Sequence, residues 1–289
     1  MSEQKVGIIA ECVCDLPKIY LREHNIDIVY FVIETDSGVF TDTDEITEEN
    51  ILSYMQSGGE KSKSSAPAPE VYRSVFEKNL EKYDEVILVA ISSGISLSCA
   101  NAEKAVSEMG EKGKRVHIFD SKHLSTGLGH LVMKAAETAE NGMSAEEILS
   151  ELSELRDRIS TSFITESVDF LYRSGKVSEK VKRICDAFNI HPVLAMKNGE
   201  LTLKSVGIGK YEKACSRYIH RELKNPDKID KERAFLTSAG CSVKMLERVR
   251  NEINGKCRFE KLIQTKASAT ISSNCGPNSF GILFIRSKF

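Results

Sequence analysis

The sequence predicts an α/β fold in two domains, and three observations support this prediction. The chain has 289 residues, and chains beyond about 250 residues tend to divide between two hydrophobic cores. In the first half, short apolar runs alternate with helical patterns, which is typical of a mostly parallel sheet flanked by helices. After about residue 160 this alternation gives way to a hairpin and irregularly spaced helices. We therefore expect an N-terminal α/β domain over residues 1–159 and a C-terminal α+β domain over residues 160–289.

The strongest strand signal is Val86–Ile91, because six consecutive apolar residues are typical of a strand covered on both faces. The other strands expected in the first half are Val6–Ala10, Ile26–Ile33 and Arg115–Phe119. Three helices are expected after capping residues: after Asp15, after Thr47, and after Ser144, which forms a capping box with Glu147. Two more helices are expected, one that ends at about Met109 and one over Gly127–Thr138. Ser57–Pro69 contains two glycines, four serines and two prolines, which predicts a loop.

In the second half, Asn198-Gly199 separates two β-type runs, which is a strong signal for a hairpin. The other elements expected there are helices near Val168–Tyr172, Glu179–Phe188, Lys210–Leu223 and Val243–Ile253, and strands at Ala234–Ala239 and Phe280–Ile285. This order of elements predicts an α+β domain rather than a second parallel sheet.

Composition narrows the classes of partner. Forty basic and forty-two acidic residues give a formal charge of −2, which offers no broad attraction for nucleic acid or anionic membrane. The first residues carry a five-residue apolar run, shorter than the roughly 7–15 residues of a secretory signal. No apolar run approaches the ~20 residues that cross a bilayer. We expect a cytoplasmic protein without stable membrane insertion.

Cysteine and glycine patterns predict neither a metal site nor a cofactor. Among eight cysteines the only close pair is Cys12-Val13-Cys14, and no CxxC occurs, so we expect free thiols that pack as small hydrophobic groups. Neither GxGxxG nor GxxxxGK[ST] is present, so the common nucleotide-binding loops are not expected.

The turn after Val86–Ile91 is the first candidate ligand site. Ser92 and Ser93 bring hydroxyls and backbone N–H groups to the carboxyl end of a parallel strand, where open α/β sheets bind ligands. An anion also suits the start of the following helix. The structural alternative is that Ser96 or Ser98 only caps that helix.

Two further hydroxyl-rich segments could bind a carboxylate or phosphate. Ser64 and Ser65 lie in the expected loop, while Asn274 and Gly276 lie in the segment Ser272–Pro277 before the last strand. Serine and asparagine side chains can each donate hydrogen bonds to an anion. Ordinary turn chemistry is the alternative for each segment taken alone.

A nucleophilic role for Ser93 is a competing hypothesis, in which the protein is a small-molecule hydrolase. The surrounding sequence is not GxSxG, since Ile91 stands two residues before Ser93. The six histidines form no HExxH or other paired arrangement. His191, which begins a strand before Pro192, is interpreted as structural. We therefore expect no catalytic residue.

Taken together, these segments resemble the DegV family of bacterial fatty-acid-binding proteins, in the same order along essentially the whole chain. The family's D-S-x-x-D-L-P turn corresponds to Glu11–Pro17, its T-S-Q-P-S loop to Ser64–Ala68, and its I-S-S-x-L-S-G-T stretch to Ile91–Ser98. Later similarities fall at Asp120-Ser121, at Gly127-Leu128-Gly129, at Ser174–Ser178 for G-G-R-[IV]-S, and at Asn274–Asn278 for H-x-G-P-G.

The resemblance implies two α/β domains with a long-chain fatty acid held in an apolar tunnel between them. It assigns the carboxylate to Ser64, Ser93 and Asn274, with weaker contributions from Ser65, Ser92, Ser96 and Gly276. It also implies a carrier that presents the fatty acid to a separate ATP-dependent fatty acid kinase. The bound lipid would be the only ligand, without a cofactor.

Two departures from the family pattern bear on the head group. Threonine is replaced by Ser64, which keeps a hydroxyl, and histidine is replaced by Asn274, which cannot carry a positive charge. An arginine-bearing segment of the family is replaced by Val206–Gly209. Two rivals stay open: a transferase related by fold to dihydroxyacetone kinase, and a regulatory protein with an incidental lipid.

Overall fold

The computed structural model describes residues 5–59, 62–173, 175 and 177–288, and the chain divides into two compact units. The first unit contains the chain up to Val32, Ser65–Ile159 and the short segment Asn198–Glu200. The second unit contains Ile33–Ser64, Ser160–Lys197 and the chain from Leu201 onward. The expected division at residue 159 put residues 33–64 in the N-terminal half, whereas the structure groups them with the C-terminal half.

A four-stranded parallel sheet forms the centre of the first unit. Its order is β2-β1-β6-β7, with β1 at Val6–Glu11, β2 at Asp27–Val29, β6 at Glu85–Ala90 and β7 at Val116–Asp120. Residues 86–90 are all fully buried, as expected for a strand covered on both faces. The predicted α/β fold with a parallel sheet is confirmed.

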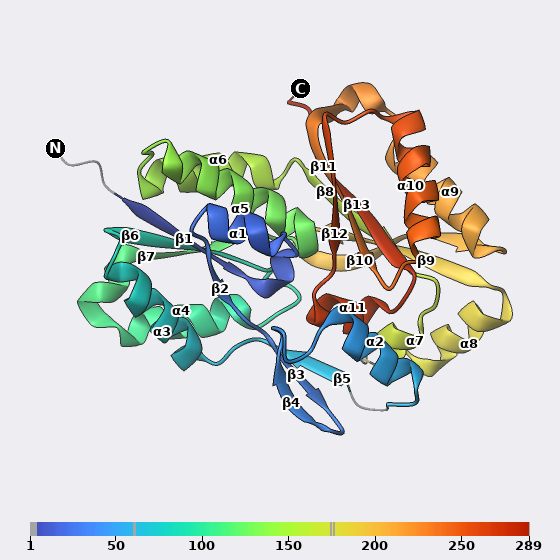
Figure 1. Ribbon diagram of the computed structural model, residues 1–289, viewed down its shortest axis with the longest axis horizontal. Coiled ribbons are helices and arrows are strands. Elements are labelled where there is room, and N and C mark those ends of the chain that lie inside the picture. The colour runs from blue at the N-terminus through green and yellow to red at the C-terminus, as the bar shows by residue number, and fades with distance from the viewer. Residues whose placement is uncertain (1–4, 60–61, 174, 176, 289) are drawn as a thin grey trace. The chain divides into compact units, whose positions relative to one another are not determined.

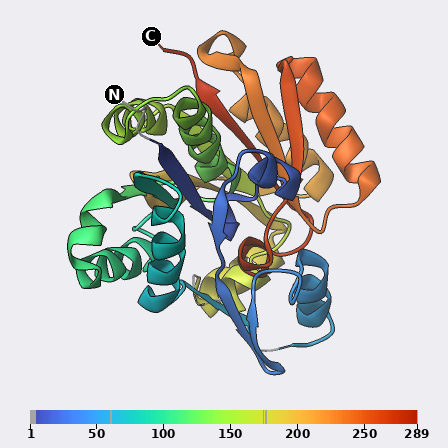
Figure 2. The same ribbon diagram turned by 60° about the vertical axis from the view of Figure 1, so that its left-hand side comes forward.

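Helices cover both faces of this sheet. Figure 1 shows α3 and α4 on one face and α1, α5 and α6 on the other, and Figure 2 shows the same layers from a second side. The helices of the unit are η1 (Cys12–Cys14), α1 (Lys18–Glu23), α3 (Pro69–Leu80), α4 (Ser98–Glu108), η2 (Gly110–Arg115), α5 (Ser125–Glu140) and α6 (Ala145–Arg156). The predicted capping box of α6 is confirmed, since Ser144 and Glu147 exchange bonds between side chain and backbone.

The expected helix cap at Asp15 is wrong. Asp15 follows η1 in the left-handed region with φ 53°, and Pro17 is the residue before α1. The Asp15 carboxylate instead accepts the hydroxyl of Ser125 at 2.5 Å, at the start of α5. The Asp15 side chain therefore makes a tertiary hydrogen bond with Ser125 instead of the local helix cap that the sequence predicted.

The second unit is built on a six-stranded mixed sheet. Its order is β10-β9-β8-β13-β11-β12, in which β11 runs parallel to β12 and antiparallel to β13. These strands are β8 (Ile159–Ile164), β9 (Ile190–Lys197), β10 (Glu200–Ile208), β11 (Ile229–Ala239), β12 (Lys261–Lys266) and β13 (Ser279–Arg286). A small sheet of order β4-β3-β5 comprises β3 (Val32–Thr35), β4 (Gly38–Thr41) and β5 (Ser62–Ser65).

Among the described residues, the helices of the second unit are α2 (Glu48–Gln56), α7 (Asp169–Arg173), α8 (Glu179–Ala187), α9 (Tyr211–Glu222), η3 (Pro226–Lys228), α10 (Val243–Lys256) and α11 (Ala269–Cys275). Residues of α9 and α10 pack on β11 and β13, while α2, α7 and α11 share a second cluster around Ile51, Phe170 and Ala269. The predicted C-terminal mixed domain is thus confirmed as part of the fold.

The predicted hairpin at Asn198-Gly199 is confirmed. Both residues have positive φ, 53° and 85°, which is the backbone that a two-residue turn of this kind requires. Thr47 is also confirmed as the cap of α2, where its hydroxyl accepts the N–H of Asn50.

Two other expectations are wrong in detail. The run Ile26–Ile33 forms two strands in different sheets, β2 and β3, rather than one. Residues 62–65 of the expected loop Ser57–Pro69 form the edge strand β5, because pairing with β3 outweighs their weak intrinsic preference.

The strand β12 and the helix α11 were not expected from the sequence. The β12 sequence Lys261–Lys266 has charged ends and lies at an edge of its sheet. The α11 sequence is rich in small polar residues, and its first turn is capped by Asp42 from more than two hundred residues away. Long-range contacts therefore create both elements. Among the described residues, no helix is both long and apolar enough to span a membrane.

Substituting Gly129 and Gly255 tests the packing of α5. A Cβ at Gly129 would approach the Cys14 backbone oxygen at 2.8 Å, whereas a Cβ at Gly255 of α10 would meet nothing within 4 Å. We expect Gly129→Ala to lower the free energy of unfolding by about 1–3 kcal/mol through overpacking. We expect the matched Gly255→Ala to raise it by roughly 0.5–1 kcal/mol, through reduced chain entropy. Urea unfolding measures both, and equal effects would contradict the close approach.

Candidate functional site

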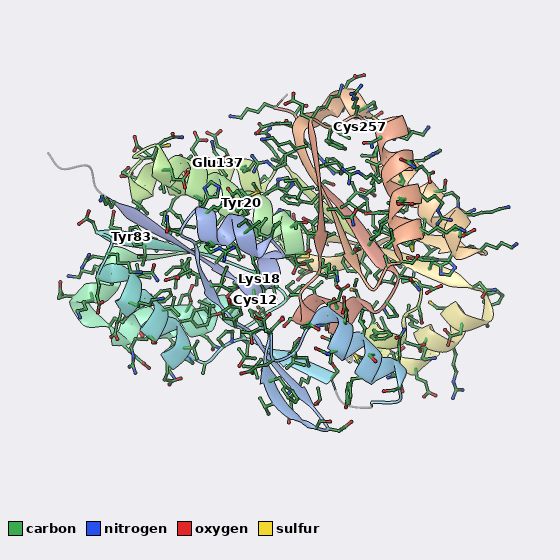
Figure 3. All side chains as sticks on the ribbon, in the orientation of Figure 1. Cys12, Lys18, Tyr20, Tyr83, Glu137 and Cys257 are labelled. Atoms are coloured by element: carbon green, nitrogen blue, oxygen red, sulfur yellow. The ribbon has the colours of Figure 1, made fainter. Side chains whose placement is uncertain are left out.

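The carboxyl ends of three parallel strands place polar side chains at one edge of the first unit's sheet. Glu11 ends β1, Ser92 and Ser93 follow β6, and Asp120 ends β7. Cys12, labelled in Figure 3, marks the chain just beyond Glu11 at this edge. Because β1, β6 and β7 are adjacent and parallel, their carboxyl ends meet, and this edge is where open α/β sheets bind ligands.

Glu11 is a fully buried carboxyl group that joins four elements. Its Oε2 accepts the N–H of Ile91 at 2.7 Å, and its Oε1 accepts the Tyr72 hydroxyl at 2.6 Å and the Ser98 hydroxyl. Tyr72 belongs to α3 and Ser98 begins α4. The carboxyl group thereby fixes both ends of the turn 91–98, which carries the candidate serines.

Burial dominates the electrostatics of this cluster. Desolvation raises the pKa of Glu11 above its ordinary value of 4.5, although the bonds from Ile91, Ser98 and Tyr72 oppose that shift. Burial and the adjacent Glu11 also raise the pKa of Tyr72, so Tyr72 remains a phenol that donates. The cluster is a structural support, because its hydrogen bonds lie among its own members.

Ser92 is buried and bonded within the first unit. Its hydroxyl donates to the carbonyl oxygen of Gly199 at 2.6 Å and accepts the N–H of Gly94 at 3.3 Å. A Cβ at Gly94 would clash with the same Gly199 oxygen, so only glycine fits there. Ser92 is therefore a positioning residue of the turn, with its hydroxyl hydrogen already in use.

Ser93 is exposed and paired with Asp120. Its hydroxyl donates to Asp120 Oδ2 at 2.6 Å, and its backbone N–H donates to Asp120 Oδ1 at 3.2 Å. Asp120 Oδ1 also accepts the N–H of Lys122 at 2.9 Å. Ser96 lies just before α4, whose N-cap is Leu97, and the Ser96 hydroxyl oxygen accepts the N–H of Ser98 at 3.2 Å.

The second unit brings two other predicted site residues together. The Asn274 side-chain amide donates to the Ser64 hydroxyl at 3.2 Å and to the Thr270 carbonyl at 2.7 Å. Ser64 comes from β5 and Asn274 from α11, and both side chains are partly exposed. Ser65 is the exposed residue next to Ser64. Residues 210 positions apart in the chain thus form one polar pair.

The side chains of Asp42 and Ser268 hold the start of α11 in place for this pair. Asp42 accepts the N–H groups of Ala269 and Thr270 at 3.2 and 2.8 Å, and Ser268 caps the same turn. At the other end, Gly276 has φ 77°, and a Cβ there would approach the Phe170 ring at 2.5 Å. Gly276 is therefore required for the backbone after Asn274 rather than as a visible hydrogen-bond donor to a ligand.

Sequence reasoning named the serines and Asn274 as candidates, but it did not name Glu11, Asp120 and Asp42 as residues that support the backbone around them. A usable signal was present for two of them, because Glu11 and Asp120 are acidic residues at the ends of buried parallel strands. Asp42 gave no such signal, since its partners lie in a helix far along the chain.

His191 behaves as the sequence predicted. It is buried, and its two ring nitrogens lie 2.6 and 2.8 Å from the carbonyl oxygens of Glu166 and Gly209. Across the described part of the chain, no group of three or more His, Cys, Asp or Glu side chains could hold a metal ion. In the similarity at 174–178, Ser174 and Lys176 lie outside the described residues.

Replacing Glu11 by glutamine should change how stability depends on pH. A buried carboxyl with a raised pKa stabilises the fold in its protonated form, and this contribution is lost as pH rises from 4.5 through the folded pKa. The unfolding free energy of the wild type should therefore fall relative to Glu11→Gln as pH rises above 4.5, by about 1.4 kcal/mol per unit of pKa shift.

The matched control is Glu147→Gln in the capping box of α6. Bonds from Ser144 lower the pKa of the exposed Glu147, so this group is ionised in folded and unfolded chains throughout that pH range. The difference in unfolding free energy between Glu147→Gln and the wild type should not change with pH. Urea unfolding at several pH values gives both curves, and parallel curves for the wild type and Glu11→Gln would refute the burial argument.

Comparison with known proteins identifies relatives along almost the whole chain. The DegV family, described as uncharacterised proteins, matches residues 5–287. A DegV domain-containing protein from Caldanaerobacter subterraneus subsp. tengcongensis is 28% identical over 281 residues, which are 97% of this chain and 99% of that protein. One from Staphylococcus aureus is 27% identical over 75% of each chain.

Solved structures share the same fold. A DegV family protein from Thermus thermophilus, described as binding fatty acid, has a TM-score of 0.85 and 25% identity, with 98% of this chain and 100% of that chain covered. A stearic acid-binding protein from Eubacterium ventriosum has a TM-score of 0.85 and 22% identity, with 97% and 98% covered. Because the family match extends from residue 5 to residue 287, this chain belongs to the DegV family.

Proposed function

We propose that this protein binds one long-chain fatty acid without covalent chemistry and carries it to another protein. The observation that carries the proposal is the similarity, along 98% of the chain, to the Thermus thermophilus protein described as binding fatty acid. The hydroxyl and amide groups of the candidate site support it, because they are suited to holding a carboxyl group.

The head group is assigned to Ser93, Ser64 and Asn274. Ser93 is exposed at the carboxyl edge of the parallel sheet, and the Ser64–Asn274 pair is partly exposed on the second unit. Each hydrogen bond to an uncharged group contributes roughly 0.5–1.5 kcal/mol net. Ser92, Ser96 and Gly276 support the proposed site by fixing its backbone, and Ser65 lies beside Ser64.

The acyl chain supplies most of the binding free energy in this proposal. Burying each CH₂ group in an apolar tunnel contributes about 0.8 kcal/mol, so the chain outweighs the few polar contacts. The polar end then sets the orientation of the lipid.

A non-catalytic carrier role fits the contacts of Ser93 better than a hydrolase or transferase. The Ser93 hydroxyl donates to a carboxylate at 2.6 Å rather than to an imidazole nitrogen, so the Ser–His arrangement of a serine nucleophile is not formed there. We propose that an ATP-dependent fatty acid kinase receives the lipid from this carrier.

The double substitution Ser64→Ala with Ser93→Ala tests the head-group assignment. Removing two hydroxyls should weaken fatty acid binding by roughly 5- to 150-fold, the equivalent of about 1–3 kcal/mol. Native mass spectrometry of the purified protein should show one bound fatty acid in the wild type, and titration calorimetry should give the ratio of affinities.

The control replaces one exposed helical serine in each unit, Ser53→Ala with Ser74→Ala. This variant should bind as the wild type does. Reproducible absence of any acyl ligand in the wild type would refute the proposed function. Equal affinity of the two double variants would instead refute only the assignment of Ser64 and Ser93.

A further inference from the structure

Asp120 determines which atoms Ser93 can offer to a ligand. A serine hydroxyl has one hydrogen and two lone pairs. In Ser93 the hydrogen is directed to Asp120 Oδ2 at 2.6 Å, and the backbone N–H is directed to Asp120 Oδ1 at 3.2 Å. Both donors of Ser93 are therefore taken, and the lone pairs of its oxygen remain as the groups for a ligand.

The Asp120 carboxylate is itself held by donors. Its three partners are the Ser93 hydroxyl, the Ser93 N–H and the Lys122 N–H at 2.9 Å, so both carboxylate oxygens act as acceptors. If Ser93 turned its hydrogen towards a ligand carboxylate, Asp120 would lose its shortest bond beside a second negative charge. Two carboxyl groups that share a site hold one proton between them.

We propose that Asp120 makes this site selective for a head group that donates a hydrogen bond, so that a fatty acid binds as its neutral acid and takes up one proton. This inference rests on the proposed function, because it assumes that Ser93 contacts the head group. The ligand O–H donates to the Ser93 oxygen, and the Ser93 hydrogen stays on Asp120. The proton comes from solution, since a free carboxylic acid with a pKa of about 4.3 is ionised at neutral pH.

The other proposed head-group residues are compatible with a neutral acid. Ser64 and Asn274 are uncharged, and Asn274 stands where the family resemblance has a histidine that can carry a positive charge. A buried ionised carboxylate without a cationic partner is costly, whereas a neutral acid needs only hydrogen bonds. The uncharged set therefore favours the same form of the ligand as Asp120 does.

Other charged and titratable groups surround the Ser93–Asp120 pair, and they carry both signs. Arg156 donates to the Asp120 backbone oxygen at 3.1 Å, and a Cβ at Gly94 would lie 3.5 Å from the Glu200 side chain. Burial lowers the pKa of His123 and raises that of Cys99 to about 12, so both are neutral near pH 7. These nearby groups include Cys99 on α4, Lys122 and His123 after β7, Arg156 and Asp157 at the end of α6, and Glu200 at the start of β10.

Proton uptake on binding tests the proposal directly. Calorimetric titration of dodecanoic acid in two buffers of different ionisation enthalpy, at about pH 7.5, should show about one proton taken up by the wild type. The dissociation constant should rise about tenfold per pH unit above neutrality. In Asp120→Asn the amide can donate to Ser93 and free its hydrogen, so uptake should fall to near zero.

Dodecan-1-ol provides a ligand control, because it has an O–H donor that does not titrate. It should bind to the wild type without proton uptake and with an affinity that is flat in pH. The protein control is Asp84→Asn, which removes an exposed carboxylate bonded to the Lys5 N–H at 2.9 Å. Asp84 lies next to Tyr83, which Figure 3 labels at the amino end of the sheet, so this variant should keep the wild-type proton uptake.

Each outcome tests either the role of Asp120 or the proposed function of fatty acid binding. Binding of dodecanoic acid by the wild type without proton uptake would overturn the role of Asp120, and so would full uptake in Asp120→Asn. Failure of dodecan-1-ol to bind where the acid binds would overturn the requirement for a donor. Failure of the wild type to bind any fatty acid between about pH 5 and 8 would instead overturn the proposed function.

Discussion

The buried carboxyl group of Glu11 is the interaction on which the ligand edge of the first unit depends. It stands at the end of β1 and accepts donors from the end of β6, from α3 and from α4. Burying such a group is costly unless its hydrogen bonds are complete, so any movement of these elements leaves a polar atom unpaired. The turn that carries Ser92 and Ser93 therefore has little conformational freedom. The positions of its hydroxyl groups are set by contacts with the ends of the sheet strands and the neighbouring helices rather than by the loop itself.

The second unit uses acidic side chains in a similar way, to capture backbone N–H groups far along the chain. Asp42 binds two N–H groups at the start of α11, and Glu48 accepts the N–H of Gly240 at 2.5 Å. Burial raises the pKa of Glu48, while Lys266 and the Gly240 N–H oppose that shift. These contacts attach residues 33–64 to the C-terminal half, and they place Ser64 of β5 beside Asn274 of α11. The polar pair is thus a product of long-range contacts, because neither segment would hold its position alone.

The proposed head-group residues share a chemical character that bears on the ligand. Ser64, Ser93 and Asn274 are uncharged, and the hydrogen of Ser93 is directed to a carboxylate. A cationic site would hold an ionised fatty acid through a charge-assisted bond, which is about twice as strong as a neutral one. A site that is neutral and accepting suits a protonated head group instead. In the proposed complex, affinity comes chiefly from burial of the acyl chain, and the polar end selects the protonation state.

The sequence by itself determined the elements whose signal is local. The apolar run of β6, the Thr47 cap of α2, the capping box of α6 and the Asn198-Gly199 turn were all predicted, because their stability comes from neighbouring residues and from burial on both faces. The serines and Asn274 were named as candidates, in the turn after an expected strand, in an expected loop and in the segment before the last expected strand, and their contact with a ligand stays a prediction. Only the tertiary structure decided that Asp15 bonds Ser125, that Ser62–Ser65 is a strand, and that α11 exists. It also decided that Glu11 and Asp120 fix the Ser93 turn. The hydrogen-bond donors that these carboxylates bind in the turn lie far away in the sequence, so no periodic sequence pattern predicts the bonds.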